Sequence, residues 1–225
     1  MIQALVFDLD DTLYPEHAFV RGGFAAVDRW LQDRRGVTGF AAEAGRLFDG
    51  GLRGLVFDEA LRRLGVDAAP PLISALVAVY REHIPQLELF PDAAWALGHF
   101  GPRCGLGLLT DGYAATQRNK VAALGIAPRF HAVVFTDDLG RENWKPSPAP
   151  FQRISQALAI PAADCAYVGD NPAKDFVAPN RLGWLTVQVR REGGEYARAT
   201  AGHLPPDHRA RAEINSLHEL EGLLS

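Results

Sequence analysis

The sequence predicts an α/β protein: a parallel sheet with crossover helices, interrupted by an all-helical segment. Short apolar runs recur along the chain, each followed by polar residues, and amphipathic helical patterns lie between them. This alternation of strand and helix patterns is typical of a parallel sheet. Residues 16–90 carry helical patterns without a convincing strand, which predicts that a helical domain is inserted after the first strand.

The expected strands are short apolar runs bounded by turn residues or acids. They are residues 2–7, Cys104–Leu109, Ala132–Phe135, Cys165–Val168 and Trp184–Val189. Helical patterns at Ala114–Leu124 and Pro150–Leu158 would supply crossovers. A last extended piece is expected at residues 213–216, followed by a helix that Ser216 caps.

Four helical patterns make up the inserted segment, at residues 17–36, 41–51, 57–65 and 70–83, and Gly or Pro residues break them. We therefore expect two domains. Residues 1–15 and 91–225 would form the α/β core, and residues 16–90 the helical domain. Leu87–Pro91 would be the linker that returns the chain to the core.

Composition excludes several classes of partner. The chain has 225 residues and a net charge of -4, so it has no excess positive charge to attract nucleic acid or an anionic membrane. Cys104 and Cys165 lie in or beside apolar runs, which favours reduced core residues. The N-terminus lacks a secretion signal pattern. We expect a cytoplasmic protein, monomeric or homodimeric, with a small-molecule ligand.

Acidic and other polar residues follow the expected strands. Asp8 and Asp10 come directly after the first, Thr110-Asp111-Gly112 after the second, and Gly169-Asp170 after the fourth, while Lys145 and Asp175 lie in nearby loops. In a parallel sheet the carboxyl ends of the strands share one edge, where ligands bind. These side chains are therefore expected to converge.

This set of residue types indicates magnesium-dependent phosphoryl transfer. Clustered carboxylates repel one another unless a cation lies among them, and oxygen ligands favour a hard ion such as Mg²⁺. A carboxylate can attack phosphorus while a hydroxyl, a lysine and the metal hold the charged oxygens. A second carboxylate two residues further on is well placed to protonate the leaving oxygen.

Four segments make the interpretation specific. FDLDDTLY, LLTDG, WKPSP and VGDNPAKDF, in this order, resemble the four sequence motifs of the haloacid dehalogenase (HAD) superfamily of phosphohydrolases. The helical insertion after the first motif is similar to the small cap domain of the first cap class of that superfamily. The resemblance covers nearly the whole chain and implies a Rossmann-like core with a helical cap domain.

The resemblance implies roles for the acids. Asp8 would be the nucleophile, and Asp10 would be the general acid and later the base that activates water. The metal site would map onto the carboxylates of Asp8 and Asp170 and the backbone carbonyl of Asp10. Asp175 would orient Lys145 or a metal-bound water.

It also implies how the phosphate is held. Thr110 would bind a phosphoryl oxygen through its hydroxyl, helped by the backbone amides of Leu9 and Asp111. Lys145 would neutralise charge on the nucleophile and the phosphate. Asp11 has no role in the family pattern, and we expect it to be a turn or capping residue.

Two further segments carry weaker expectations. Asp137 and Asp138 belong to no motif and are expected to lie in a solvated turn. Specificity is expected in the cap, with Phe48–Gly54 as the preferred segment because its glycines allow backbone to approach a ligand.

The expected activity is hydrolysis of a small phosphomonoester, such as a sugar phosphate, a nucleotide or a phosphoglycolate-like compound, through an aspartyl-phosphate. A phosphomutase of the β-phosphoglucomutase type shares every core residue, so these residues do not separate the two. Asp10 argues against a haloacid dehalogenase, which does not need that acid. The absence of lysine from residues 15–91 argues against a phosphonatase, which would use a cap lysine.

Explanations of another class are a phosphate-accepting signalling domain and an inactive binding scaffold. Receiver domains carry their phosphorylated aspartate on a middle strand and lack a helical insertion after the first, whereas Asp8 here follows the first strand. An inactive scaffold would have little reason to keep every active-site residue type. The sequence does not identify the physiological substrate.

Overall fold

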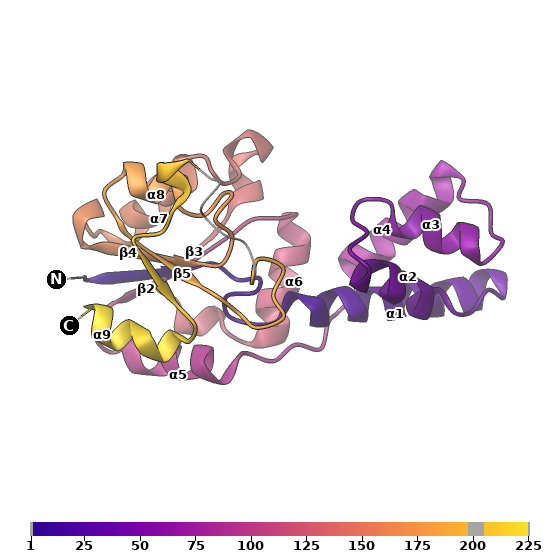
Figure 1. The fold of residues 1–225 in the computed structure, drawn as a ribbon, viewed down its shortest axis with the longest axis horizontal. Helices are drawn as coiled ribbons and strands as arrows, with labels where there is room; N and C mark the ends of the chain where they lie inside the picture. Colours follow the sequence, from indigo (N-terminus) through magenta and orange to yellow (C-terminus); the bar gives the residue numbers. More distant parts are fainter. Residues whose placement is uncertain (1, 198–204, 225) are drawn as a thin grey trace. The chain divides into compact units, whose positions relative to one another are not determined.

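The computed structural model describes residues 2–197 and 205–224. The chain forms two compact units: Met1–Glu16 with Glu88–Ser225, and His17–Leu87. The first unit contains the sheet and the second is helical, as the ribbon in Figure 1 shows. The predicted fold class, a parallel α/β sheet with a helical insertion after the first strand, is confirmed.

The sheet has six parallel strands in the order β3-β2-β1-β4-β5-β6. The strands are β1 (Ala4–Phe7), β2 (Gly105–Thr110), β3 (Ala132–Phe135), β4 (Cys165–Gly169), β5 (Leu185–Val189) and β6 (Ala212–Ile214). Phe7 at the end of β1 is in register with Leu108 of β2 and Val168 of β4. The residues that follow these three central strands therefore emerge side by side at one edge.

Helices cover both faces of the sheet. Figure 1 shows α5 (Pro91–Phe100) and α9 (Leu220–Leu224) on one side, and α7 (Ala149–Leu158) and α8 (Val177–Arg181) on the other. On the α7 side, the Phe151 ring packs edge-on against Tyr167 at 5.0 Å and Trp184 at 5.9 Å between centroids. These buried aromatic rings fill the space between the sheet and the helices, so the strand ends are set on a rigid base.

The remaining elements of the sheet unit lie in its connections. Helix α6 (Ala114–Leu124) follows β2. Short 3₁₀ turns are η1 (Ala127–Arg129), η2 (Thr136–Leu139), η3 (Arg141–Asn143), η4 (Ala162–Asp164), η6 (Pro206–His208) and η7 (Leu217–Glu219). Ser216 caps η7 in a capping box with Glu219, and α9 continues from it, so the predicted cap is confirmed.

The helical unit is built on α1 (Glu16–Arg35), α2 (Phe40–Asp49), α3 (Val56–Arg63) and α4 (Pro70–Glu82). Its core includes Phe24 and Phe40, with Tyr80 packed against them. A Cβ at Gly23 would lie 2.4 Å from the Tyr80 ring, so the glycine is what lets α1 approach α4. The amphipathic patterns of the insertion thus bury one common apolar face.

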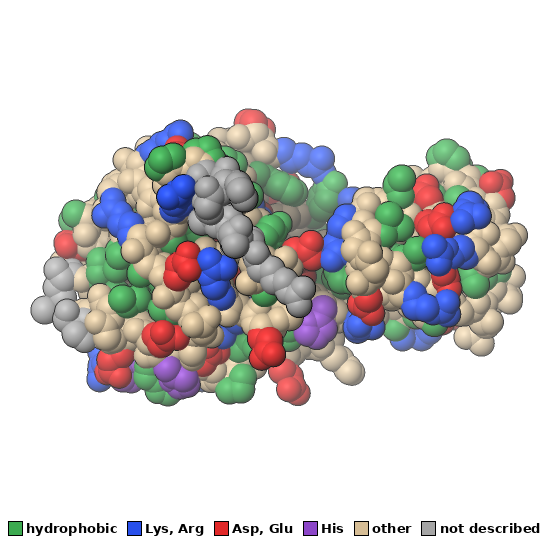
Figure 2. All heavy atoms as spheres, viewed as in Figure 1, with side chains coloured by type: hydrophobic (Ala, Val, Ile, Leu, Met, Phe, Trp, Pro, Cys, Tyr) green, Lys and Arg blue, Asp and Glu red, His purple; other side chains and the backbone are tan. Residues whose placement is uncertain are grey.

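The surface agrees with the composition. On the face drawn in Figure 2, basic and acidic side chains are interspersed and do not gather into a large patch of one sign.

Cys104 and Cys165 are both free, as expected. Among the described residues, no helix combines the length and apolarity that crossing a membrane requires.

One buried ion pair joins distant parts of the sheet unit. Asp92, in the first turn of α5, accepts hydrogen bonds from Arg191 Nη1 at 2.6 Å, Ser216 Oγ at 3.0 Å and the Leu217 amide at 2.8 Å. Arg191 also donates to the Thr12 carbonyl at 2.7 Å. Burial would raise the pKa of Asp92, but the Arg191 bond and the other donors lower it overall.

We expect Asp92→Asn to lower the free energy of unfolding at pH 7 by about 3 kcal/mol, because it leaves Arg191 buried without its counter-ion. Since the pKa of Asp92 is lowered in the folded state, its contribution is present at neutral pH and is lost as pH falls through the folded pKa. Urea unfolding at pH 7 and at about pH 3 checks both statements, because the difference between parent and variant should shrink at the lower pH.

Asp207→Asn is the matched control, since Asp207 forms an exposed ion pair with Arg181. It should change the free energy of unfolding by no more than about 1 kcal/mol. Equal effects of the two substitutions at pH 7 would contradict the importance given to Asp92.

Candidate active site

Asp8 lies directly after β1 and is held by a buried lysine. Lys145 Nζ donates to Asp8 Oδ1 at 2.7 Å, to Asp175 Oδ1 at 2.8 Å and to Tyr167 Oη at 2.9 Å. The Lys145 side chain is 0% exposed, and that of Asp8 is 6% exposed. Three residues from β1, β4 and the loops after them are thus tied together by one cation at the edge of the sheet.

The charges at this point depend on one another. Burial raises the pKa of Asp8 to about 6, although Lys145 opposes the change, and the nearby Asp175 carboxylate adds to it. Burial would lower the pKa of Lys145, but Asp175 and Asp8 raise it well above its usual value. Lys145 is therefore a cation at neutral pH, and Asp8 is mostly ionised.

Asp8, Asp170 and Asp175 form a buried cluster whose ligand oxygens all lie within 4.8 Å of one another. Both oxygens of Asp175 are already in use, because Lys145 binds one and the Asn171 amide donates to the other at 2.9 Å. Among the described residues, no hydrogen bond reaches the carboxylate oxygens of Asp170. Asp170 is thus a buried acid with its oxygens still available.

This donor set fits a hard divalent cation. Burial and the neighbouring Asp175 and Asp8 carboxylates raise the pKa of Asp170 well above its usual value. A cation among these oxygens would offset the repulsion that causes the shift. Asp8 and Asp170, both predicted as metal ligands, are therefore brought together by the fold with a chemistry suited to Mg²⁺.

Asp10 lies two residues after Asp8 but has a different set of partners. Its Oδ1 accepts a hydrogen bond from Lys120 Nζ at 2.7 Å and another from the Tyr14 hydroxyl. Its Oδ2 accepts from Gln117 Nε2 at 2.9 Å. Burial would raise the pKa of Asp10, but Lys120 and these hydrogen bonds lower it overall, so Asp10 is ionised at neutral pH.

Thr110 is the last residue of β2 and is fully buried. Its Oγ1 accepts a hydrogen bond of 2.6 Å from Gln117 Nε2, the same nitrogen that binds Asp10. Next to it, Asp111 Oδ1 accepts from the Lys145 amide at 3.1 Å and from Thr136 Oγ1 at 2.8 Å. Asp111 thus positions the loop that carries Lys145.

Comparisons with known proteins agree with this geometry. A family model of haloacid dehalogenase-like hydrolases matches residues 2–183. The chain belongs to the haloacid dehalogenase-like hydrolase family. The predicted superfamily, with a helical cap inserted after the first strand, is therefore confirmed.

The chain is similar to three proteins whose names differ. A glyceraldehyde 3-phosphate phosphatase of Methanopyrus kandleri is 34% identical over 207 residues, 87% of this chain and 86% of that protein. A phosphoserine phosphatase of Thermus thermophilus is 32% identical over 150 residues, 66% of this chain and 59% of that protein. The crystal structure of a 2-haloacid dehalogenase from Pseudomonas syringae is 28% identical, with a TM-score of 0.67 over 100% of this chain and 98% of that one.

In this hydrolase a cavity of about 400 Å³ opens where the predicted residues meet. Its lining includes Asp8, Asp10, Asp111, Lys145 and Asp170. Thr110 and Asp175 lie behind that lining, where they bind Gln117 and Lys145. The fold thus gathers the predicted side chains at one site, while their individual roles stay predictions.

Leu9 is buried, and its carbonyl accepts from the Leu13 amide at 2.9 Å, which closes the turn after β1. The phosphate contacts expected of the Leu9 and Asp111 amides stay predictions, as does the metal contact of the Asp10 carbonyl.

The expected capping role of Asp11 is confirmed. Its φ is 47°, and its two oxygens accept from the amides of Glu16 at 2.8 Å and Glu195 at 3.0 Å. It therefore supports the first turn of α1 and has no place among the clustered acids.

The expectation of a solvated turn is wrong for Asp137. This half-buried residue accepts from the Ala114 amide at 3.0 Å and from Trp144 Nε1 at 3.3 Å, so it binds the start of α6 and a residue that lines the cavity. Asp138 is exposed and pairs with Arg118 at 2.6 Å, as a solvated position allows.

Sequence reasoning missed several residues of the cavity. They are Glu16, Gln117, Lys120, Trp144, Asn171, Lys174, Glu195 and Tyr196. One signal was present: the whole chain contains three lysines, against twenty arginines, and all three line this cavity. Each pairs with a different aspartate: Lys145 with Asp8, Lys120 with Asp10 and Lys174 with Asp111.

Glu16 adds a further acid to the lining. Burial raises its pKa to about 7, and the Asp10 carboxylate contributes in the same direction, while Lys120 opposes it. Glu16 is consequently only partly ionised near neutral pH.

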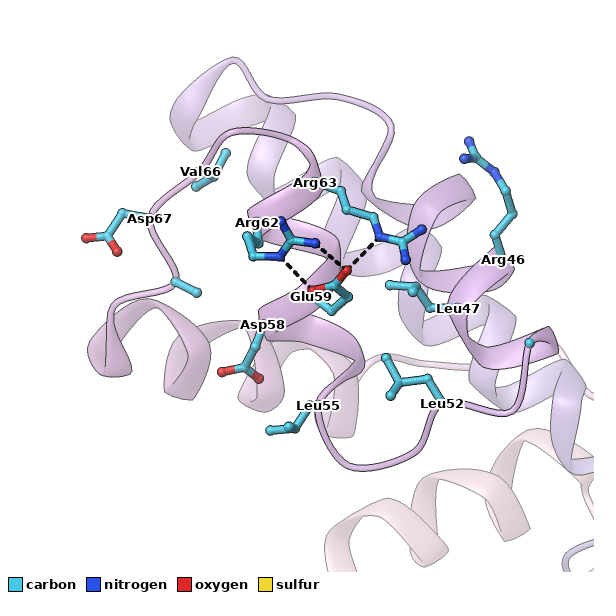
Figure 3. A pocket seen from close by; sticks show the side chains of 12 residues that line it. Arg46, Leu47, Leu52, Leu55, Asp58, Glu59, Arg62, Arg63, Val66 and Asp67 are labelled. Atoms are coloured by element: carbon cyan, nitrogen blue, oxygen red, sulfur yellow. Dashed lines mark hydrogen bonds and ion pairs between the residues drawn. The ribbon is translucent and has the colours of Figure 1, made fainter.

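A larger cavity, of about 840 Å³, lies wholly in the helical unit (Figure 3). Figure 3 shows Arg62 and Arg63 reaching toward Glu59, which they bind at 2.7 and 2.8 Å. Arg62 is thus paired with Glu59 of its own helix, and Arg63 is paired with Glu59 and with Glu43 of α2, so neither arginine is left unpaired for a ligand.

The segment Phe48–Gly54 is largely packed on itself. The Arg53 guanidinium stacks 3.8 Å from the centre of the Phe48 ring, and Arg53 Nη1 donates to the Phe48 carbonyl at 2.7 Å. Its part in substrate specificity stays a prediction.

Proposed function

We propose that this phosphatase of the haloacid dehalogenase-like family hydrolyses a small-molecule phosphomonoester, with Mg²⁺ as cofactor and Asp8 as the nucleophile. The observation that carries the proposal is the pairing of Asp8 with Lys145 beside the available carboxylate of Asp170. This arrangement combines an oriented nucleophile, a fixed cation and a place for a metal at the mouth of one cavity.

The relatives support a small phosphorylated substrate. Two relatives that align over most of their length are named as glyceraldehyde 3-phosphate phosphatases, and another relative is named as a phosphoserine phosphatase. A cavity of about 400 Å³ can hold a phosphate group with a short carbon chain. Glyceraldehyde 3-phosphate is therefore the first substrate to test.

In the first step, an oxygen of Asp8 attacks phosphorus, and the bond from phosphorus to the leaving oxygen breaks. Asp10 gives a proton to that oxygen, so an alcohol leaves and an aspartyl-phosphate remains on Asp8. Asp10 is ionised in the free protein because Lys120 lowers its pKa. A bound phosphate dianion raises that pKa again by like-charge repulsion, which allows Asp10 to take up the proton it donates.

In the second step, Asp10 accepts a proton from water as the water oxygen attacks phosphorus. The bond from phosphorus to the Asp8 oxygen breaks, which releases inorganic phosphate, restores the Asp8 carboxylate and leaves Asp10 protonated, as it was at the start of the first step. Lys145 stays next to Asp8 throughout and neutralises part of the negative charge there. Thr110 holds a phosphoryl oxygen through its hydroxyl.

Asp8 and Asp170, with the Asp10 carbonyl, would hold the magnesium ion, and Asp175 would keep Lys145 in place. When bound, the ion supplies positive charge that draws electron density from the phosphoryl oxygens.

The test is a phosphate-release assay with Mg²⁺. The panel contains glyceraldehyde 3-phosphate, phosphoserine, sugar phosphates, nucleoside monophosphates and phosphoglycolate. We expect release from at least one member, and we expect excess chelator to abolish it because the acidic cluster then lacks its cation. Addition of Mg²⁺ back to the chelated protein should restore the rate.

Two other outcomes would redirect the assignment. Transfer of phosphate to another hydroxyl without net release would identify a mutase. Halide release from a 2-haloacid, together with no phosphate release from the panel, would identify a dehalogenase, the activity named for the structural relative from Pseudomonas syringae. Activity undiminished in excess chelator would contradict the metal assignment.

A further inference from the structure

Two buried side chains of α6 reach the same acid. Gln117 and Lys120 are three residues apart, so they lie on one face of the helix about one turn from each other. Their side chains bind the two different oxygens of Asp10, Lys120 at Oδ1 and Gln117 at Oδ2. Two side chains of helix α6 therefore bind both oxygens of this carboxylate.

Counting hydrogen bonds distinguishes the two oxygens of Asp10. A carboxylate oxygen can accept about two hydrogen bonds. Oδ1 accepts from both Lys120 and Tyr14, whereas Oδ2 accepts one hydrogen bond, from Gln117, within the described part of the chain. Oδ2 is thus the oxygen with capacity left to carry a proton.

The hydrogen bond from the Gln117 amide also sets the direction in which the Thr110 hydroxyl can donate its own hydrogen. Gln117 Nε2 has two hydrogens, and its two acceptors are Asp10 Oδ2 at 2.9 Å and Thr110 Oγ1 at 2.6 Å. Because Thr110 Oγ1 accepts from this amide, its own hydrogen is left to donate elsewhere. A phosphoryl oxygen can only accept, so the hydroxyl is set in the state that binds it.

The neighbouring backbone leaves room for this arrangement. Gly112 has a φ of 124°, and a Cβ there would lie 3.2 Å from the Gln117 side chain. The reverse orientation of the Gln117 amide would set its oxygen against the Asp10 carboxylate, where both groups accept and neither donates. The loop after β2 and the charge of Asp10 thus select one position and one orientation for the amide.

We propose that Gln117 and Lys120 are positioning residues of the reaction: Lys120 fixes Asp10 so that Oδ2 carries the transferred proton, and Gln117 orients the Thr110 hydroxyl toward the phosphate. The proposal rests on the proposed function, because it assigns the residues that prepare the general acid and the phosphate-binding hydroxyl of that same site. It identifies α6 as the element that couples these two groups.

Steady-state kinetics of single variants give the first test. Lys120→Met should lower kcat about 10- to 100-fold, because Asp10 loses its orientation, while KM stays within about threefold. Gln117→Leu should lower kcat and also weaken inhibition by inorganic phosphate. Gln117→Glu should be more damaging than Gln117→Leu although its shape is conserved, because it presents an acceptor to Asp10 and Thr110.

Arg118→Met is the matched control. Arg118 lies between the two residues on the same helix and also pairs with an aspartate, Asp138, but on the exposed side. It should leave kcat and KM within about twofold of the parent, since exposed pairs contribute little. If Lys120→Met and Gln117→Leu behave like Arg118→Met, the proposal is overturned.

Double variants test whether Lys120 acts through Asp10 and Gln117 acts through Thr110. Adding Lys120→Met to Asp10→Asn, or Gln117→Leu to Thr110→Val, should reduce the remaining rate far less than it does in the parent. Losses that multiply independently in both pairs would overturn the proposal, because the residues would then act by another route. Circular dichroism of every variant verifies that the fold is kept.

An NMR experiment tests the contact between Lys120 and Asp10 without requiring catalytic activity. Because the chain has three lysines, protein labelled with ¹⁵N-lysine gives at most three side-chain ammonium signals, and Lys120→Met identifies one of them. Asp10→Asn should shift this signal more than those of Lys145 and Lys174. If the Lys120 signal does not respond to Asp10→Asn, the contact is absent in solution and the proposal fails. A parent that releases no phosphate would instead refute the proposed function, while these spectra would still report on the contact.

Discussion

Asp8→Asn should reduce phosphate release by at least about 10³-fold while the protein remains folded. The substitution keeps the size of the side chain and an oxygen that can accept from Lys145, but an amide oxygen is a poor nucleophile toward phosphorus. It also removes one negative charge from the cluster with Asp170 and Asp175. The thermal unfolding temperature should therefore stay level or rise, although activity is lost.

Asp11→Asn provides a control within the same motif. Asp11 accepts from the Glu16 and Glu195 amides and does not belong to the acidic cluster. An asparagine can still accept one of these hydrogen bonds, so kcat should stay within about threefold of the parent. Rates of phosphate release, measured at saturating substrate with Mg²⁺, compare the two variants.

Two results would contradict the assignment of Asp8. The first is undiminished release by Asp8→Asn. The second is an equal loss in Asp8→Asn and Asp11→Asn, which would indicate a general effect of acidic residues in this loop. Mass spectrometry of rapidly quenched parent protein adds a direct check, because a phosphoryl group should be found on the peptide that contains Asp8.

Lys145→Met is expected to impair both stability and activity. Lys145 is fully buried and donates to Asp8, Asp175 and Tyr167, so its loss leaves two carboxylates in the core without their cation. Breaking a buried ion pair in this way costs about 3 to 5 kcal/mol of unfolding free energy. Activity should fall at least about 10²-fold, because the charge next to the nucleophile is gone.

Urea unfolding with and without Mg²⁺ shows the cause of the destabilisation. If the loss comes from repulsion among Asp8, Asp170 and Asp175, then Mg²⁺ should stabilise Lys145→Met more than it stabilises the parent. Arg118→Met, which breaks an exposed pair, should change the free energy of unfolding by less than about 1 kcal/mol. An unfolding free energy for Lys145→Met equal to that of the parent would contradict this account.

Much of the fold could be predicted from local patterns. The apolar runs of β1 and β4 are buried in the sheet nearly as expected, because a strand covered on both faces must be continuously apolar. The run at β3 also forms a strand, but at the edge of the sheet, where buried and half-buried residues alternate. The boundaries of β2 differ from the prediction. β2 begins one residue later than predicted and includes Thr110, whose backbone continues the ladder to Phe135 of β3 although its side chain is polar.

The predicted site residues were those that sit at strand ends or within motifs. Asp8, Thr110 and Asp170 follow directly from the rule that carboxyl ends of parallel strands share an edge. Gln117 and Lys120 could not be found in this way, because they lie within a helix where polar side chains are ordinary. Asp137 was misjudged for a related reason, since a sequence cannot show that its carboxylate meets the start of α6 and Trp144.

The sequence by itself determined the order of strands and helices, the insertion after β1 and the acids at the strand ends, because these depend on local periodicity and on chain direction. Only the tertiary structure decided which lysine pairs with which aspartate. Three lysines from α6 and two loops each meet a different aspartate, and these aspartates follow two different strands. Such pairings join residues up to 137 positions apart, and only the packing of α6 and the loops against the sheet sets them.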